Sequence, residues 1–353
     1  MIDHKIYDTA ALLTVLRDDK TMDPPATYWL DMFGLQANFT TEFVDFNQIA
    51  GNRRIAPLVV PTAEGLPIYS AAERTTRIRP AYIKVKDPIT ATEMVTTKAG
   101  LGEVNSGRQL TPMQRYNQLV VEVVRQHREA ITRRWEKMAA DAVITGQNIL
   151  EDDRYPRRVV DYRRDASHTV ALTGAARWGE PGVDIESDLQ TWITRMRNAK
   201  FGGPANRLTV GADVWEVMRQ DTQLRETMNL DYKYNVNNGT EMNMGLRQGM
   251  DVERVGRLSG ILDVYVYSDY YEDENGDPVN YMSPKDIVLT GPSMTGYRLF
   301  GAILDKGANF QALPIFPKMW NEEDPSATVI MHQSAPLMAP LKPNATFRAT
   351  VVG

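Results

Sequence analysis

The sequence predicts an α+β protein, and three stretches of unusual length or pattern carry that prediction. One helix is expected over residues 111–146, where about 34 residues at about 1.5 Å each would span roughly 50 Å. A long segment at 50–77 has turn residues but also an apolar run. Residues 184–305 alternate helix and strand patterns, as a separate α/β unit would.

Composition allows about two domains and gives no sign of a polyanion-binding or membrane protein. The chain has 353 residues, 40 basic against 45 acidic, and a net charge of −5. A nucleic-acid-binding chain is expected to show a basic surplus. Cysteine is absent, which excludes disulfides and thiolate chemistry. Neither a signal peptide nor an apolar run of membrane-spanning length is visible, so we expect synthesis in the cytoplasm.

Residues 1–38 are predicted to form an N-terminal arm. Asp8 can cap a short helix carrying Leu12 and Leu16, and a second helical patch covers 26–33. Each is too short to be stable alone in water, so it must be covered by this molecule or by a neighbour. We expect an arm that is mobile or that clasps a partner.

Residues 39–94 are predicted to be strands around an extended loop. Residues 42–49 run one way and 78–86 run back, with a bulge or an edge position at Pro80. The intervening 50–77 is longer than loops inside compact domains usually are. Its run 55–60 (IAPLVV) is too apolar for a solvated linker, so we expect another subunit to cover it.

Residues 95–183 are predicted to form a domain around the long helix. Thr111 can cap it, Pro112 suits the first turn, Gln114 completes a capping box and Gly146 ends it. One apolar stripe is expected to pack on strands 78–86 and on the C-terminal tail: Tyr116, Val120, Val124, His127, Ile131, Trp135, Met138 and Ala142. The charged remainder, which includes Glu129, Glu136 and Asp141, is expected to face outward.

Three further segments complete the prediction. Residues 150–165 mix both signs of charge, which favours a solvated hairpin with cross-strand ion pairs over a phosphate-binding patch. In the 184–305 unit, Asp184 caps a helix that closes near 202–203, strands follow at 207–210 and 286–290, and 261–267 forms a hairpin across the turn at Asn275-Gly276. Residues 306–353 are expected to return to the sheet of the 95–183 domain.

The motifs that could carry chemistry are incomplete. Residues 291–296 (GPSMTG) resemble a phosphate-binding loop, but Tyr297 and Arg298 replace its lysine and its metal-ligating hydroxyl, which favours a turn. Residues 272–277 (EDENGD) lack calcium-loop spacing and fit a hairpin turn. The four histidines are too far apart in sequence for a zinc pair, and His127 fits a hydrogen-bonded core residue. We expect no catalytic residue, cofactor or metal site.

An ordered series of short motifs resembles a known family. Upstream, the matching residues are 39–42 (FTTE), Gln48-Ile49 with Gly51, and 80–86 (PAYIKVK). The series continues with 263–271 (DVYVYSDYY), Asn275-Gly276, 287–291 (IVLTG), 296–303 (GYRLFGAI), 317–320 (PKMW), Asp324-Pro325 and 333–338 (QSAPLM). The chain resembles the major capsid proteins of lambda-type tailed bacteriophages from about residue 39 to its end.

The resemblance implies a Hong Kong 97-type capsid fold: N-terminal arm 1–38, extended loop 50–77, spine helix 111–146, a peripheral domain and an axial domain at 184–305. It implies a structural, non-enzymatic head protein that assembles into hexamers and pentamers of an icosahedral shell around DNA, without reading its sequence. A scaffolding protein, a portal and a decoration protein are the implied partners. No lysine lies within 50–77, which argues against a crosslink anchored there.

Two alternatives remain at this point. An encapsulin-type cellular compartment has the same fold and is also a shell. An enzyme centred on 184–305, with a site that the motifs do not reveal, would form discrete small particles with turnover.

Overall fold

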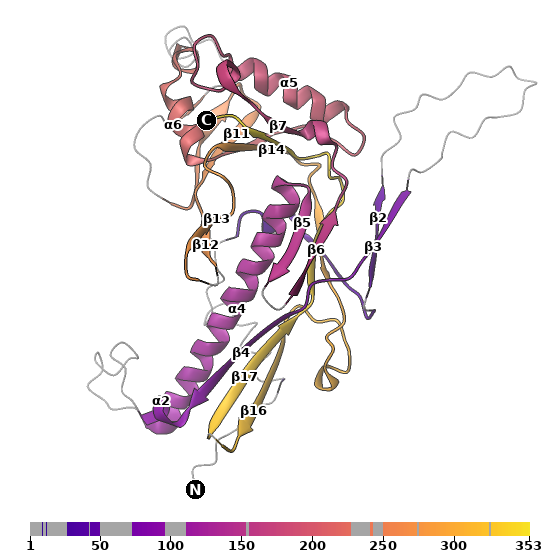
Figure 1. The fold of residues 1–353 in the computed structure, drawn as a ribbon, viewed down its shortest axis with the longest axis vertical. Helices are drawn as coiled ribbons and strands as arrows, with labels where there is room; N and C mark the ends of the chain where they lie inside the picture. Colours follow the sequence, from indigo (N-terminus) through magenta and orange to yellow (C-terminus); the bar gives the residue numbers. More distant parts are fainter. Residues whose placement is uncertain are drawn as a thin grey trace, which may run out of the picture.

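The computed structural model is an elongated α+β molecule in which one long helix connects two sheet regions (Figure 1). Its description covers residues 9, 12, 27–41, 43–49, 73–95, 111–152, 155–226, 241–242, 250–273, 275–324 and 326–353. The predicted extended loop therefore lies mostly outside the described residues, as does most of the first predicted arm helix.

The long helix α4 (Pro112–Ile144) confirms the strongest sequence prediction. Thr111 and Gln114 form the capping box, with Oγ1 of Thr111 accepting from the Gln114 N–H and Oε1 of Gln114 accepting from the Thr111 N–H. Gly146 follows the helix with φ +73°, a left-handed conformation that favours glycine. All eight stripe residues named above are buried.

Two small sheets lie along α4 (Figure 1). The first has the order β16-β17-β4, and its strands are β16 (Phe316–Glu322), β17 (Ala327–Ser334) and β4 (Ile83–Thr90). The second has the order β1-β15-β18, and its strands are β1 (Leu35–Asn38), β15 (Gly296–Phe300) and β18 (Pro336–Pro340). The expected packing of the stripe on 78–86 and on the C-terminal tail is confirmed, because α4 contacts β4, β17 and β18.

A seven-stranded sheet with the order β7-β19-β14-β8-β11-β10-β9 lies at the C-terminal end of α4. Its strands are β7 (Thr169–Ala171), β19 (Phe347–Thr350), β14 (Asp286–Thr290), β8 (Arg207–Val210), β11 (Leu262–Tyr267), β10 (Val252–Leu258) and β9 (Glu241–Met242). Helices α5 (Ile185–Asn198) and α6 (Ala212–Gln220) cover one face, where Ile287 and Leu289 join their core. Val288 points to the other face and joins the core around α4. Every residue of β14 is buried, as predicted.

The remaining elements are short. They are the 3-10 turn η1 (Leu30–Met32), helix α2 (Ala91–Val95), and the hairpins β2 (Val44–Ile49) with β3 (Glu73–Ile78), β5 (Gln147–Asp152) with β6 (Tyr155–Asp161), and β12 (Tyr270–Glu272) with β13 (Pro278–Asn280). Three further 3-10 turns lie at Ala166–His168, Gly174–Ala176 and Lys306–Ala308. The predicted turns at 291–296 and 272–277 are confirmed, since each connects two successive strands.

Several predicted strand pairings are wrong. Strand β2 (Val44–Ile49) pairs with β3, whereas β4 belongs to a different sheet and pairs with β17. Strand 261–267 pairs with β10 and β8, and the Asn275-Gly276 turn connects β12 to β13. Alternation identifies a strand and its buried face, but strand partners distant in sequence are chosen by packing.

The predicted domain boundaries near the C-terminus also do not match the sheets to which the strands belong. β15, predicted within the 184–305 unit, pairs with β1 and β18. β19, predicted to return to the sheet of the 95–183 domain, instead pairs with β14 and β7 in the seven-stranded sheet. Helix α5 ends at Asn198 rather than near 202–203, because Ala199 is already extended with ψ 148°.

Part of the predicted arm lies on its own subunit rather than on a partner. The helix expected at 26–33 is the three-residue turn η1, and Trp29 and Phe33 beside it are fully buried. Leu12 is buried in a cluster formed by Ile89 of β4, Ile330 of β17 and residues in the N-terminal half of α4.

Candidate functional site

Residues 28–30 are bound to the long helix α4 through one buried carboxylate. One carboxylate, Glu136, accepts three consecutive backbone N–H groups: Oε1 from Tyr28 at 3.0 Å and from Trp29 at 2.8 Å, and Oε2 from Leu30 at 2.9 Å. Glu136 is 2% exposed, and burial raises the pKa of its carboxyl despite these hydrogen bonds. We call this contact the Glu136 clasp.

The same segment also reaches the two neighbouring sheets. The Tyr28 hydroxyl lies 2.6 Å from Oγ1 of Thr209 on β8, and the Arg207 guanidinium stacks on the Tyr28 ring at 5.5 Å. Burial raises the pKa of Tyr28 to about 12. Arg298 on β15 donates to the Leu30 carbonyl at 2.9 Å. Residues 28–30 therefore fasten the helix to both sheets.

The prediction that Glu136 lies on the outward face of the helix is wrong, because its side chain is buried. A second buried stripe runs beside the first near the C-terminal end of α4: Thr132, Glu136, Ala139, Ala140 and Val143. The small residues Ala139 and Ala140 were the available signal, because close packing on a second face favours small side chains.

Two histidines far apart in sequence meet between α4 and β17. The Nδ1 atoms of His127 and His332 lie 2.7 Å apart, and Nε2 of His127 lies 2.8 Å from Oδ2 of Asp87 on β4. With Asp87 accepting from His127, the bonding assigns His332 as donor to Nδ1 of His127. The expected hydrogen-bonded core role of His127 is confirmed, but its partner His332 carried no sequence signal.

Burial keeps both histidines neutral at physiological pH. It lowers the pKa of His127 although Asp87 opposes the shift, and it lowers the pKa of His332 to about 3, with the neighbouring His127 adding to the shift.

Within the described residues, no group of three or more His, Asp or Glu side chains is placed to hold a metal ion. Among the helices of the described ranges, none has the length and apolarity needed to cross a bilayer.

Arg164 connects the C-terminal end of α4 to the seven-stranded sheet. Its guanidinium donates to the carbonyls of Val143 and Ile144 at 2.9 and 2.8 Å, and to the hydroxyls of Thr346 and Thr169. Cations near a helix C-terminus interact favourably with its exposed carbonyls. Burial lowers the pKa of Arg164 to about 10, which still leaves it charged.

We expect Arg164→Leu to lower the free energy of unfolding by about 2 kcal/mol, because the last carbonyls of α4 would lose buried donors. Thermal denaturation of the unassembled subunit measures this loss. Arg157→Leu is the control, since Arg157 is 63% exposed and its ion pair with Glu151 is 3.6 Å long. Equal melting temperatures for the two variants would contradict the proposed role of Arg164.

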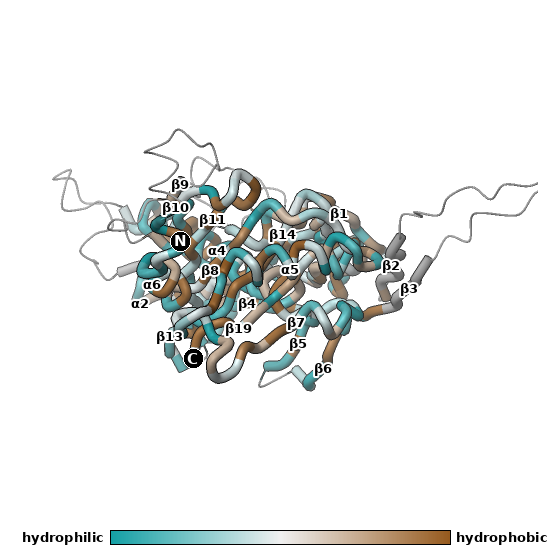
Figure 2. Tube along the Cα trace, turned by 90° about the horizontal axis from the view of Figure 1, so that it is seen from above, coloured by the Kyte–Doolittle hydropathy of each residue, from teal (hydrophilic) through white to brown (hydrophobic). Residues whose placement is uncertain are grey.

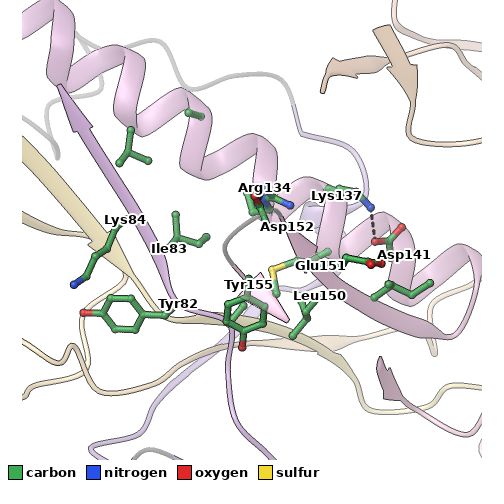
Figure 3. Close-up of a pocket in the computed structure, with 15 residues that line it drawn as sticks. Tyr82, Ile83, Lys84, Arg134, Lys137, Asp141, Leu150, Glu151, Asp152 and Tyr155 are labelled. Carbon is green, nitrogen blue, oxygen red and sulfur yellow. Dashed lines mark hydrogen bonds and ion pairs between the residues drawn. The ribbon is translucent and has the colours of Figure 1, made fainter. Parts of the chain in front are cut away.

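A hollow of about 760 Å³ lies between β4, α4 and the β5–β6 hairpin (Figure 3). Tyr82 and Lys84 approach from one side, and Arg134, Lys137 and Asp141 descend from α4. Four of its charged side chains form two ion pairs: Arg134 with Asp152 at 2.6 Å, and Lys137 with Asp141 at 2.7 Å. Because these side chains neutralise one another, the hollow suits contact with another polypeptide segment better than it suits catalysis.

Comparison with known proteins identifies the family. The family described as Phage major capsid protein E matches residues 8–351. The chain belongs to this family. Its members are structural proteins of the phage head and not enzymes, so the enzyme alternative centred on 184–305 is wrong.

Relatives of this family match the chain almost from end to end. The major capsid protein of Enterobacteria phage phi80 is 28% identical, over 96% of this chain and 97% of its own length. That of Escherichia phage lambda is 26% identical, over 94% and 95%. The crystal structure of the putative capsid protein of an E. coli CFT073 prophage shares the fold, with a TM-score of 0.72, 22% identity and coverage of 98% and 99%. The predicted resemblance and the phage-capsid fold are confirmed.

The chain is therefore a structural protein of a phage capsid shell. In this setting the Glu136 clasp, the histidine pair and Arg164 are the contacts that join the long helix to the sheets around it. They hold the long helix and the sheets in one fixed arrangement within the subunit.

Proposed function

We propose that the chain assembles into hexamers and pentamers that close an icosahedral head around phage DNA. The observation that carries this proposal is the match of the capsid family to residues 8–351, with the phi80 and lambda relatives covered over 97% and 95% of their own lengths. A chain that matches head proteins over its whole length contains the assembly surfaces that such proteins need.

The partners are part of the same proposal. A scaffolding protein, a portal and a decoration protein would act with the subunit, which is made in the host cytoplasm and ends in the virion. The net charge of −5 supports a shell that encloses DNA without recognising its base sequence. The phi80 and lambda relatives compared above are phage major capsid proteins, which favours a phage head over an encapsulin-type compartment.

Negative-stain electron microscopy of the expressed protein tests the proposal. Expressed alone or with a scaffolding protein, the chain is expected to form shells, tubes or rings of five and six subunits. Many modest contacts per subunit, multiplied by avidity, should hold such assemblies together. Small monodisperse particles under every condition, including high protein concentration, would contradict it.

A further inference from the structure

The outward face of the β5–β6 hairpin carries an apolar pair that the sequence-based prediction of a solvated, charged hairpin did not include. Ile149 and Val159 lie directly opposite each other in the antiparallel register. Their exposed fractions are 44% and 48%, whereas their neighbours Asn148 and Val160 are buried. In a strand, alternate residues point to opposite faces, so this pair occupies the face turned away from the core.

The inward face fixes the hairpin on the subunit. Asn148 donates to the Tyr162 hydroxyl at 2.8 Å, and that hydroxyl donates to the Met338 carbonyl of β18 at 2.6 Å. Arg134 of α4 binds Asp152 at 2.6 Å. Ile149 and Val159 are therefore presented on a preorganised platform, which lowers the entropic cost of a contact.

Polar groups border the apolar pair along the hairpin. Toward its tip, Glu151 pairs with Arg157 at 3.6 Å. Toward its base, Asp161 is exposed and accepts the backbone N–H of Arg163. An apolar centre with a polar rim is the arrangement of protein–protein contacts.

The apolar surface continues past Val159 into a second hollow of about 610 Å³. Phe43, 48% exposed, lines it together with Ile78, Arg79 and Arg158. β5 and β6 lie at the rim of the molecule in Figure 2. A neighbouring molecule can therefore reach this surface, which we call the hairpin face and define by Phe43, Ile149 and Val159.

We propose that the hairpin face is a contact surface between two copies of this chain in the shell. The inference rests on the proposed function and names a surface that serves it. The border holds both signs of charge, with Arg79, Arg157 and Arg158 beside Glu151 and Asp161. A second copy offers a counter-charge to each sign, whereas the uniformly negative surface of DNA would meet the carboxylates.

Thiol labelling tests the inference, because the natural chain contains no cysteine and Val159→Cys creates a unique thiol. Iodoacetamide is small enough to report access in both free subunits and purified shells. We expect Cys labelling at this position to be at least tenfold slower in shells than in free subunits. Ile261→Cys, at a residue that is 54% exposed outside the hairpin face, serves as the matched control for reagent access.

Equal labelling rates in shells and free subunits at position 159 would overturn the inference. So would an equal slowing at positions 159 and 261, because protection would then not be specific to the hairpin face. If the unsubstituted protein formed no shells at all, the proposed function itself would fail, which is a separate outcome.

A second variant tests the energetic contribution of the surface. Ile149→Thr with Val159→Thr removes exposed apolar area while keeping β-branched side chains that suit strands. We expect at least a tenfold lower shell yield in gradient sedimentation, with the circular dichroism and the melting temperature of the free subunit unchanged. Shell yields equal to those of the unsubstituted protein would overturn the proposal.

Discussion

Glu136→Ala is expected to release residues 28–30 from the long helix. The free energy of local opening of this segment should fall by about 3 kcal/mol. Three backbone N–H groups would lose their acceptor at once. An orphaned buried donor costs about 1–3 kcal/mol, reduced where water can enter. Water has a route here, because a hollow of about 340 Å³ borders Glu136. Hydrogen exchange of peptides spanning 27–33 measures the effect, as protection about 100-fold lower than in the unsubstituted subunit.

Two further substitutions define the cause. Glu136→Gln should have an intermediate effect, because an amide oxygen still accepts from two donors while its NH₂ group would face a third N–H. Glu122→Ala is the matched control: Glu122 lies on the same helix but pairs with Arg125 at a 37% exposed position. Exposed ion pairs contribute little, so exchange at 27–33 should not change. Unaltered protection in Glu136→Ala would show that the clasp does not hold the segment.

The histidine pair is expected to make the free subunit lose about 2 kcal/mol of stability between pH 7 and pH 5. The folded pKa of His332 lies at about 3, below the ordinary value of about 6.5 that applies in the unfolded chain. Because the folded pKa is the lower one, the stabilisation is complete above about pH 6.5. As the pH falls toward the folded pKa, it is lost progressively, since the unfolded chain binds the proton more readily. Urea denaturation at a series of pH values measures the slope.

His332→Gln is the variant that isolates this effect. Its amide can still donate to Nδ1 of His127, but it does not titrate, so the slope between pH 7 and pH 5 should become shallower by the contribution of His332, while His127 and His168, whose pKa values burial also lowers, keep theirs. Ordinary carboxylates titrate mostly below this range, which keeps them from obscuring the result. A slope that is the same in both proteins would assign the acid sensitivity to other groups.

The local structure of the long helix could be predicted from the sequence because its signals are local. A capping box at Thr111, a glycine at 146 and apolar residues at steps of three and four each act within one or two turns. The existence of most strands followed from alternation in the same way. The structure confirms the helix within two residues at its C-terminus. The capsid family could be predicted from the series of motifs, because their order along the chain is specific even though each motif is short.

Strand partners and the residues of the candidate site could not be predicted, because they depend on segments distant in sequence. Tyr28 and Glu136 lie 108 positions apart, and His127 and His332 lie 205 apart. Nothing near Glu136 in the sequence shows that backbone N–H groups from residues 28–30 would satisfy it. A charged residue beside a buried stripe is exposed by default, and only that distant contact compensates its burial.

By itself, the sequence determined the long helix, the position of most strands, the absence of cysteine and the capsid family. These depend on neighbouring residues or on the order of motifs along the chain. Only the tertiary structure decided that β19 joins the seven-stranded sheet, that Glu136 is buried, and that Ile149 and Val159 face outward together. Each of these is an outcome of packing among segments far apart in the chain, where burial of apolar area and satisfaction of hydrogen bonds are settled by the whole molecule.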